Sequence, residues 1–228
     1  MLLQYESVQL KLNQSNSIPM TKLTLIRHGE TDWNAKRRIQ GQLDAPLNEV
    51  GHAQAKAIGL RFRDETIDVL ICSDLSRAMQ TMQPIANACG LEVFHDSRLR
   101  ERKLGVLEGL FYEEAQNKMP QVLDVFRSRQ IDTPIDGGES LREFAQRVTA
   151  FLTETAETYA GKQIVIVTHG GVVDIACRHA NGSSLDAPRD HPIHNTSVST
   201  FRIDSSGFHL IDEADLSHLP TNMSMDDA

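Results

Sequence analysis

The sequence predicts an α/β fold, namely a sandwich with a mainly parallel central sheet, an antiparallel edge and a helical cap insertion. Three observations carry this prediction. Short, continuous apolar runs alternate with longer helix-like segments, as in sheets that helices bury on both faces. Two extended runs near the end of the chain flank a turn sequence, which predicts a hairpin. A polar, helix-prone stretch broken by prolines interrupts the alternation, which predicts an insertion.

Four apolar runs are predicted as strands, at residues 23–26, 69–72, 91–94 and 164–167. The run at 91–94 is the weaker one, and the other three are continuous, which is typical of strands covered on both faces. The final hairpin is expected from residues 197–203 and 208–211, around the turn Asp204-Ser205-Ser206-Gly207. Its strands are expected to lie antiparallel at one edge of the sheet.

Helices are predicted between these strands. Asn48 is expected to cap a helix that reaches about Arg63. Ser73 or Asp74 is expected to cap a second helix that reaches about Cys89.

The third predicted helix begins with a capping box. Ser140 and Glu143 form the S-x-x-E pattern, and apolar residues recur behind it at helical spacing up to about Tyr159. A fourth helix is predicted over residues 171–180, where Asn181-Gly182 ends it.

The chain of 228 residues is expected to form one domain over residues 21–219. Residues 104–138, broken by Pro120 and Pro134, are expected to form a helical cap over one end of the sheet. Residues 1–20 lack the apolar core of a secretory signal and are interpreted as a flexible extension, with Met20 as an alternative start. Residues 220–228 are expected to be a flexible tail.

Composition narrows the class of function. A formal net charge of −8 argues against a general nucleic-acid surface or an anionic membrane surface, but a local positive pocket would still admit a small anionic substrate. No apolar run reaches membrane-spanning length. The three cysteines, Cys72, Cys89 and Cys177, lie in apolar runs, which favours reduced thiols and a cytoplasmic location.

Charged side chains follow the predicted strands at the points where those strands end. Arg27 and His28 follow the first strand, and His169 follows the last parallel one; glycine comes next in both places. Arg77 lies about one turn into the helix after the second strand, and Glu101 comes after the third. Because the carboxyl ends of parallel strands share one edge of a sheet, these five residues are expected to converge in one pocket.

This set of side chains suits the transfer of a phosphoryl group. Two arginine forks bind phosphate oxygens, a neutral histidine is a nucleophile, and a second, protonated histidine would stabilise the oxygens. A glutamic acid can protonate the leaving oxygen and then activate water. By spacing alone, a structural role for the two histidines is about as plausible as a catalytic one. The pair His191 and His194 is a weak metal candidate, and no metal site is predicted.

At these positions the sequence resembles the histidine phosphatase superfamily, the phosphoglycerate mutase-like enzymes. The matching segments extend from about residue 22 to 219; they are Leu25-Ile26-Arg27-His28-Gly29-Glu30-Thr31, Trp33-Asn34, Arg38-Ile39-Gln40-Gly41, Pro46-Leu47-Asn48-Glu49, Gly51, Ser73-Asp74-Leu75-Ser76-Arg77-Ala78, Leu99-Arg100-Glu101, Gly137-Gly138-Glu139-Ser140, Thr168-His169-Gly170-Gly171 and Asn195-Thr196-Ser197. Arg-His-Gly alone is a weak pattern, but these segments in this order make a strong one.

The resemblance implies a three-layer α/β/α sandwich and assigns roles to the residues of the expected pocket. His28 would become the phosphohistidine, Glu101 would be the proton donor and then the base, and Arg27, Arg77 and His169 would complete the phosphate pocket. The substrate-binding residues that the resemblance implies are Asn34, Thr31, Gln40, Gly41 and Gly170. The expected partner is a small phosphorylated metabolite, without a cofactor, a nucleic acid or a membrane.

Three functions follow from the resemblance. After Glu101 the chain reads Arg102-Lys103-Leu104-Gly105-Val106-Leu107-Glu108-Gly109, which is similar to the phosphatase branch and lacks the tyrosine of the phosphoglycerate mutases. A metal-independent phosphomonoester phosphatase is therefore the preferred interpretation, and a bisphosphoglycerate-dependent phosphoglycerate mutase is the alternative. A phospho-ligand sensor without turnover is less favoured, because it would need neither His28 nor Glu101. Edge strands leave a homodimer open.

Overall fold

The computed structural model describes residues 19–189 and 192–220. The predicted flexible extension and tail lie almost entirely outside these ranges, and so does His191.

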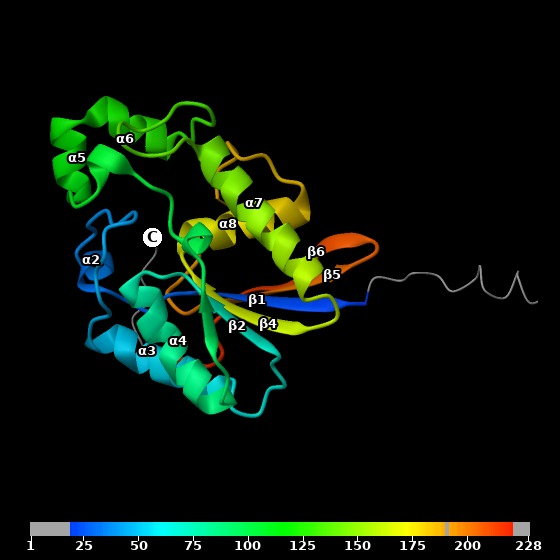
Figure 1. The fold of residues 1–228 in the computed structure, drawn as a ribbon. Coiled ribbons are helices and arrows are strands. Elements are labelled where there is room, and N and C mark those ends of the chain that lie inside the picture. Colours follow the sequence, from blue (N-terminus) through cyan, green and yellow to red (C-terminus); the bar gives the residue numbers. More distant parts are fainter. Residues whose placement is uncertain (1–18, 190–191, 221–228) are drawn as a thin grey trace, which may run out of the picture.

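Six strands of the described chain form one mixed sheet in the order β3-β2-β4-β1-β5-β6 (Figure 1). Their bounds are β1 Thr21–Arg27, β2 Val69–Cys72, β3 Val93–His95, β4 Gln163–Thr168, β5 Val198–Asp204 and β6 Gly207–Asp215. Strands β1, β4, β2 and β3 are parallel, whereas β5 runs antiparallel to both β1 and β6. The predicted parallel sheet with an antiparallel edge is confirmed.

Helices cover both faces of the sheet, which makes three layers (Figure 1). The covering helices are α3 Glu49–Arg61 and α4 Ser76–Cys89 on one face, and α7 Leu141–Thr158 and α8 Gly170–Asn181 on the other. Side chains alternate across β1, so that Leu23 and Leu25 pack with α7 and α8 while Ile26 packs with α3 and α4. This two-sided burial is the physical reason for the continuous apolar runs.

The predicted cap is a separate helical layer beyond the carboxyl ends of the parallel strands (Figure 1). It contains the 3-10 turn Gly105–Leu107, α5 Tyr112–Lys118 and α6 Pro120–Arg127. Leu107, Ala115 and Leu123 are fully buried there, in a small apolar cluster of their own. The cap therefore has a core distinct from the two cores on the sheet faces.

Most predicted helix ends agree with the structure. Asn48 caps α3 by accepting a hydrogen bond from the backbone N–H of Gly51 at 2.8 Å. The capping box of Ser140 and Glu143 begins α7, and Gly182 ends α8 with a left-handed φ of 65°.

The structure differs from the local predictions in three places. The residue that precedes α4 is Leu75, which makes no side-chain cap, because Ser73 and Asp74 are engaged by His169 and Arg100. The third strand begins two residues later and ends one residue later than predicted, because β3 pairs with β2 only from residue 93 onward. A short helix, α2 Asp32–Ala35, follows β1 where no helix was predicted.

The strand order places a topological switch between β1 and β4. These two strands are neighbours, but the chain leaves β1 toward α3 on one face of the sheet and leaves β4 into α8 on the other. Such a divergence opens a crevice at the carboxyl ends of the two strands, where ligands bind in sheets of this kind. His28 and His169 are the first residues after β1 and β4, so both stand at this crevice.

The three cysteines are free, as predicted, with Cys72 and Cys177 buried and Cys89 partly buried. Burial raises the pKa of the Cys72 and Cys177 thiols, which keeps both protonated. Among the described residues, no helix combines the length and the apolar composition that a membrane crossing requires.

Candidate active site

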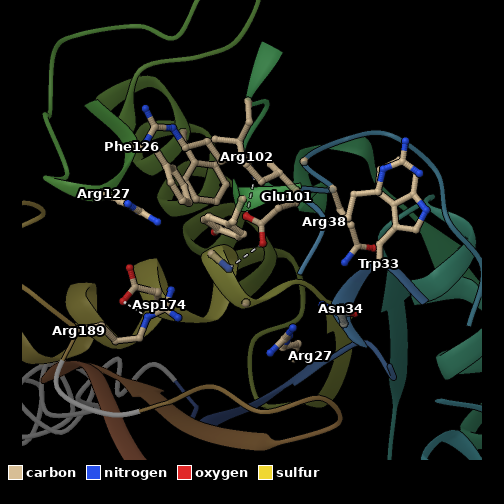
Figure 2. Close-up of a pocket in the computed structure, with 18 of the residues that line it drawn as sticks. Arg27, Trp33, Asn34, Arg38, Glu101, Arg102, Phe126, Arg127, Asp174 and Arg189 are labelled. Carbon is tan, nitrogen blue, oxygen red and sulfur yellow. Dashed lines mark hydrogen bonds and ion pairs between the residues drawn. The ribbon is translucent and has the colours of Figure 1, made fainter. Parts of the chain in front are cut away.

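A cavity of about 690 Å³ lies at the switch point, between the carboxyl ends of the strands and the cap (Figure 2). Arg27, His28, Arg77 and Glu101 line it. His169 stands beside His28, with the ring centroids 5.2 Å apart and the rings edge to face. The structure therefore brings all five predicted residues together from four separate parts of the chain.

A hydrogen bond to the backbone holds one nitrogen of the His28 ring. Its Nδ1 lies 2.7 Å from the carbonyl oxygen of Gly29, and because a carbonyl only accepts, Nδ1–H donates. In the neutral ring, Nε2 therefore keeps its lone pair. Burial, followed by the charges of Arg77 and Arg27, lowers the pKa of His28 well below its usual 6.5. The free protein thus presents a neutral imidazole, the form that a nucleophile needs.

Two arginines are buried around this ring. Arg27 is 2% exposed at the end of β1 and donates to the carbonyl of Ile193 at 2.6 Å. Arg77 is 1% exposed in the first turn of α4 and donates to the carbonyls of Gly41 and Leu43, at 2.7 and 2.9 Å. Burial lowers the pKa of Arg77 to about 10, so it remains charged at neutral pH. Together they make the floor of the cavity strongly positive.

Glu101 is held by two backbone N–H groups. Its Oε1 accepts from the N–H of Arg102 at 2.7 Å, and its Oε2 accepts from the N–H of Gly171 at 2.9 Å. A Cβ atom at Gly171 would lie only 2.1 Å from Oε1 of Glu101. The Glu101 carboxylate therefore occupies the space that a side chain at position 171 would need. The first turn of α8 thus orients this carboxylate toward the cavity (Figure 2).

His169 is fully buried and makes one side-chain hydrogen bond, between its Nε2 and the hydroxyl of Ser73 at 2.8 Å. Its Nδ1 is buried without a hydrogen-bond partner among the described residues. Burial is the largest of several causes that lower the pKa of His169 well below 6.5, followed by the charge of Arg77. In the free protein this ring is therefore neutral, whereas a protonated form was expected. A bound phosphate dianion would raise its pKa again.

The other predicted binding residues separate into two groups. Asn34, Gln40, Gly41 and Gly170 line the cavity. Thr31 does not; it is fully buried behind the wall, where it caps α2 and its hydroxyl lies 3.0 Å from Asn34 Oδ1 and 3.1 Å from Gln40 Oε1. Thr31 thus supports two lining side chains, and its direct contact with a ligand stays a prediction.

Several lining residues were not predicted from the sequence. Arg38 stacks on the Trp33 ring at 4.2 Å and donates to the carbonyl of Gly109 at 2.6 Å. Arg102 and Asp174 also line the cavity. The sequence does contain an indication that Asp174 lies at the site. It stands one helical turn after Gly170, in a segment that is otherwise apolar until Arg178.

Across residues 19–189 and 192–220, no group of three His, Cys, Asp or Glu side chains is placed to hold a metal ion. What the cavity does offer is a neutral histidine lone pair, two guanidinium groups and a carboxylate, the parts that phosphoryl transfer without a metal requires.

Comparison with known proteins gives a consistent result. The model of the histidine phosphatase superfamily (branch 1) matches residues 23–215. The phosphoglycerate mutase-like protein 4 of Arabidopsis thaliana is 41% identical over 209 residues, which cover 90% of each chain. The metal-independent phosphoserine phosphatase of the same plant is 39% identical over 204 residues, covering 88% of this chain and 84% of that protein. Among solved structures, YhfR of Bacillus stearothermophilus superposes with a TM-score of 0.82 at 32% identity, covering 87% of this chain and 98% of that one.

Proposed function

Because the chain belongs to the histidine phosphatase superfamily, we propose that it hydrolyses small phosphomonoesters without a metal ion, through a phosphohistidine on His28. The observation that carries this proposal is the Nδ1–H of His28 at 2.7 Å from the Gly29 carbonyl. That hydrogen bond fixes the tautomer whose Nε2 can attack phosphorus, directly beside Arg27 and Arg77. The similarity to a metal-independent phosphoserine phosphatase supports the same reaction class.

In the first step, the lone pair of His28 Nε2 forms a bond to phosphorus, and the bond between phosphorus and the alcohol oxygen breaks. Glu101 supplies the proton that the leaving alkoxide needs. Arg27 and Arg77 stabilise the charge on the phosphoryl oxygens during the transfer. The Nδ1 of His169, which has no hydrogen-bond partner among the described residues, is the natural further donor to one of those oxygens.

In the second step, a water molecule attacks phosphorus and the bond from phosphorus to Nε2 breaks. Glu101, now a carboxylate, accepts the proton of the attacking water, and inorganic phosphate leaves. No cofactor enters either step. The proton that Glu101 gives to the alcohol is thereby recovered from water, so the enzyme returns to its starting state.

The test is hydrolysis of a panel of phosphomonoesters, including 3-phosphoglycerate and phosphoserine, in metal-free buffer. Release of free phosphate is expected, together with transient acid-labile labelling of the protein from an ester carrying radioactive phosphate. Both signals should vanish in His28→Ala. Hydrolysis that survives largely intact in His28→Ala would refute the phosphohistidine route.

A mutase is the second candidate, favoured by the 41% identity to a phosphoglycerate mutase-like protein. A mutase transfers the phosphoryl group back to a hydroxyl of the ligand, and it must exclude water while it does so. It would convert 3-phosphoglycerate into its isomer without free phosphate and would depend on a bisphosphoglycerate primer. Following free phosphate and isomer in the same reaction separates the two functions.

A further inference from the structure

Arg77 can bind a phosphoryl group only if its guanidinium keeps one orientation in the cavity. The structure fixes that orientation at the two terminal nitrogens, which donate to the carbonyl oxygens of Leu43 and Gly41 at 2.9 and 2.7 Å. The Nε of Arg77 is buried and has no hydrogen-bond partner among the described residues. Both carbonyls belong to the loop 40–43, which follows α2 and borders the cavity through Gln40 and Gly41. The direction of the Arg77 fork therefore depends on where this loop lies.

A carboxylate of the cap bonds the middle of this loop. Oε1 of Glu108 accepts from the backbone N–H of Gln42 at 2.9 Å and from the backbone N–H of Leu104 at 2.8 Å. The Glu108 side chain also lies against the backbone of Gly41, where an added Cβ would overlap the carboxylate. Glu108 itself does not line the cavity. Any effect of Glu108 on a bound phosphoryl group must therefore pass through the loop.

Backbone contacts next to Glu108 join the cap to the chain just before the loop. The N–H of Ile39 donates to the carbonyl of Leu110 at 2.9 Å, and the N–H of Gly109 donates to the carbonyl of Ile39 at 2.8 Å. Residues 38 and 111 form a β-bridge beside them, where the chain after α2 approaches the start of α5 (Figure 1). The cap segment that carries Glu108 is thus a fixed support for the loop.

The far end of the loop is anchored separately. Asp44 accepts from the backbone N–H of Ser76 at 2.9 Å and from its hydroxyl at 2.7 Å, at the start of α4. The side chain of Gln42 donates to the backbone carbonyl of Glu101 at 3.1 Å. These contacts would keep the loop in place without Glu108, but they leave the Gln42 N–H without its acceptor. Loss of the Glu108 contact should therefore shift the loop and not unfold it.

Glu108 could act on Arg77 by its charge or by its reach. Burial lowers the pKa of Arg77, and among the carboxylates that oppose this effect Glu108 comes after Glu101 and Asp44. The charge of Glu108 is therefore a minor influence on Arg77. Its hydrogen bond to the Gln42 N–H is a direct one, since Gln42 lies between the two residues whose carbonyls hold the guanidinium.

We propose that Glu108 is a positioning residue that orients Arg77 toward the phosphoryl group. It acts through the loop 40–43, whose Gly41 and Leu43 carbonyls hold the guanidinium. The length of the Glu108 side chain, and not its charge, sets the position of the loop. This inference rests on the proposed function, which places the phosphoryl group beside the two buried arginines and the nucleophilic histidine.

The experiment compares two substitutions that separate length from charge. Glu108→Gln keeps the length of the side chain and an acceptor oxygen, whereas Glu108→Asp keeps the charge and shortens the side chain by a methylene group. Binding of inorganic phosphate is measured by calorimetry, which requires no turnover. Glu108→Asp should weaken phosphate binding about tenfold, the size of a charge-assisted hydrogen bond from Arg77. Glu108→Gln should stay within about threefold of the wild type.

Glu114→Asp is the matched control. Glu114 also belongs to the cap, and its carboxylate accepts from the backbone N–H of Phe111 at 3.0 Å and from Lys118 at 3.2 Å, away from the loop 40–43. The same shortening at this position should leave phosphate binding unchanged. Urea unfolding of each variant shows whether the fold is intact.

A double variant tests whether the effect passes through Arg77. Arg77→Lys keeps a positive charge, so phosphate still binds, but it lacks the planar fork that the two loop carbonyls orient. In this background Glu108→Asp should weaken phosphate binding no further, because both changes act on the same contact. A general structural role for Glu108 would weaken binding in either background. If the Arg77→Lys protein does not fold, the comparison of Glu108→Asp with Glu108→Gln decides alone.

The outcomes separate the two proposals. Equal phosphate binding by the wild type and Glu108→Asp would overturn the positioning role, even if the wild-type protein hydrolyses esters. A loss in Glu108→Gln as large as that in Glu108→Asp, or losses that add in the double variant, would overturn it too. If phosphate binding depends on Glu108 as expected while the wild type releases no phosphate from any ester, the positioning role stands and the hydrolytic function falls.

Discussion

Gly171→Ala is the substitution that tests most directly whether Glu101 works as an acid. The new methyl group would stand 2.1 Å from Glu101 Oε1 and 3.1 Å from a ring carbon of Phe144, whereas real Cβ contacts stay beyond 3.0 Å. The carboxylate is the flexible partner of the two, since Phe144 is packed in the core. It must therefore retreat by roughly 1 Å, from a contact at 2.1 Å to one beyond 3.0 Å.

The structure sets opposite expectations for activity and stability. Misplacing a catalytic group by about 1 Å costs on the order of 100-fold in rate, or about 2.7 kcal/mol of transition-state stabilisation. The fold should lose little, because alanine is preferred to glycine in a helix by about 1 kcal/mol, which offsets the weakened hydrogen bond to Glu101 of similar size. The melting temperature should stay within a few degrees of wild type.

The assay compares kcat/KM for an alkyl phosphate and for p-nitrophenyl phosphate. An alkoxide needs the proton of Glu101 to leave, whereas p-nitrophenolate leaves without one. Gly171→Ala should therefore reduce kcat/KM about 100-fold for the alkyl ester and by much less for the aryl ester. Glu101→Gln should show the same contrast. The double variant should lose no more than Glu101→Gln alone, because both changes act on one group.

Two results would refute this reasoning. An equal loss on both esters would mean that Gly171→Ala disturbs the phosphate pocket and not the acid. Losses that add in the double variant would mean that Gly171 acts independently of Glu101.

Three further predictions follow from the site and its surroundings. Chelation by EDTA should leave turnover unchanged, and restoration of a lost rate by a divalent cation would contradict the metal-free mechanism. Ser73→Ala removes the hydrogen bond that orients His169, so kcat should fall roughly tenfold and the free energy of unfolding should fall by about 1 kcal/mol. Steady-state kinetics and urea unfolding measure the two effects. An unchanged kcat would exclude an orienting role for Ser73. In the pH profile of kcat/KM, the midpoint of the acid limb should lie below pH 6.5, because the pKa of His28 is lowered and its Nε2 stays unprotonated to lower pH. A midpoint above pH 6.5 would contradict this expectation.

Stability should also depend on pH through a histidine outside the pocket. Burial lowers the pKa of His218 to about 4, so between about pH 6.5 and 4 the unfolded chain binds a proton that the folded protein excludes. Stability should therefore fall as the pH drops through this window. After allowance for partial exposure, His218→Gln should remove about 1 kcal/mol of the loss between pH 7 and 5, measured by urea unfolding. An unchanged pH dependence would show that His218 does not contribute.

Much of the fold could be predicted because the relevant signals are local. The runs at 23–26, 69–72 and 164–167 lie within β1, β2 and β4, since burial on both faces requires uninterrupted apolar residues. The helix caps at Asn48 and Ser140 could be predicted because each side chain bonds a backbone N–H only three residues away. The cap predicted at Ser73 or Asp74 was wrong, because long-range partners compete for those side chains.

The convergence of Arg27, His28, Arg77, Glu101 and His169 could also be predicted, because the ends of parallel strands meet at one edge. Their chemical state could not. Only the packed structure shows that His28 Nδ1 faces a carbonyl and that both histidines are buried beside arginines, which lowers their pKa. Desolvation and charge proximity depend on distances across the fold, which the order of residues does not contain.

The sequence by itself determined the layered α/β fold, the strand ends that carry charge and the family to which the chain belongs. Tertiary structure alone decided which side chains face the cavity. It moved Thr31 behind the wall, brought Ser73 to His169 across 96 residues, and buried Arg102 at the cavity with its guanidinium on the backbone carbonyl of Glu139. The local pattern of apolar residues indicates which residues of a helix or strand are buried. Which charged side chains meet depends instead on which elements the order of strands makes neighbours.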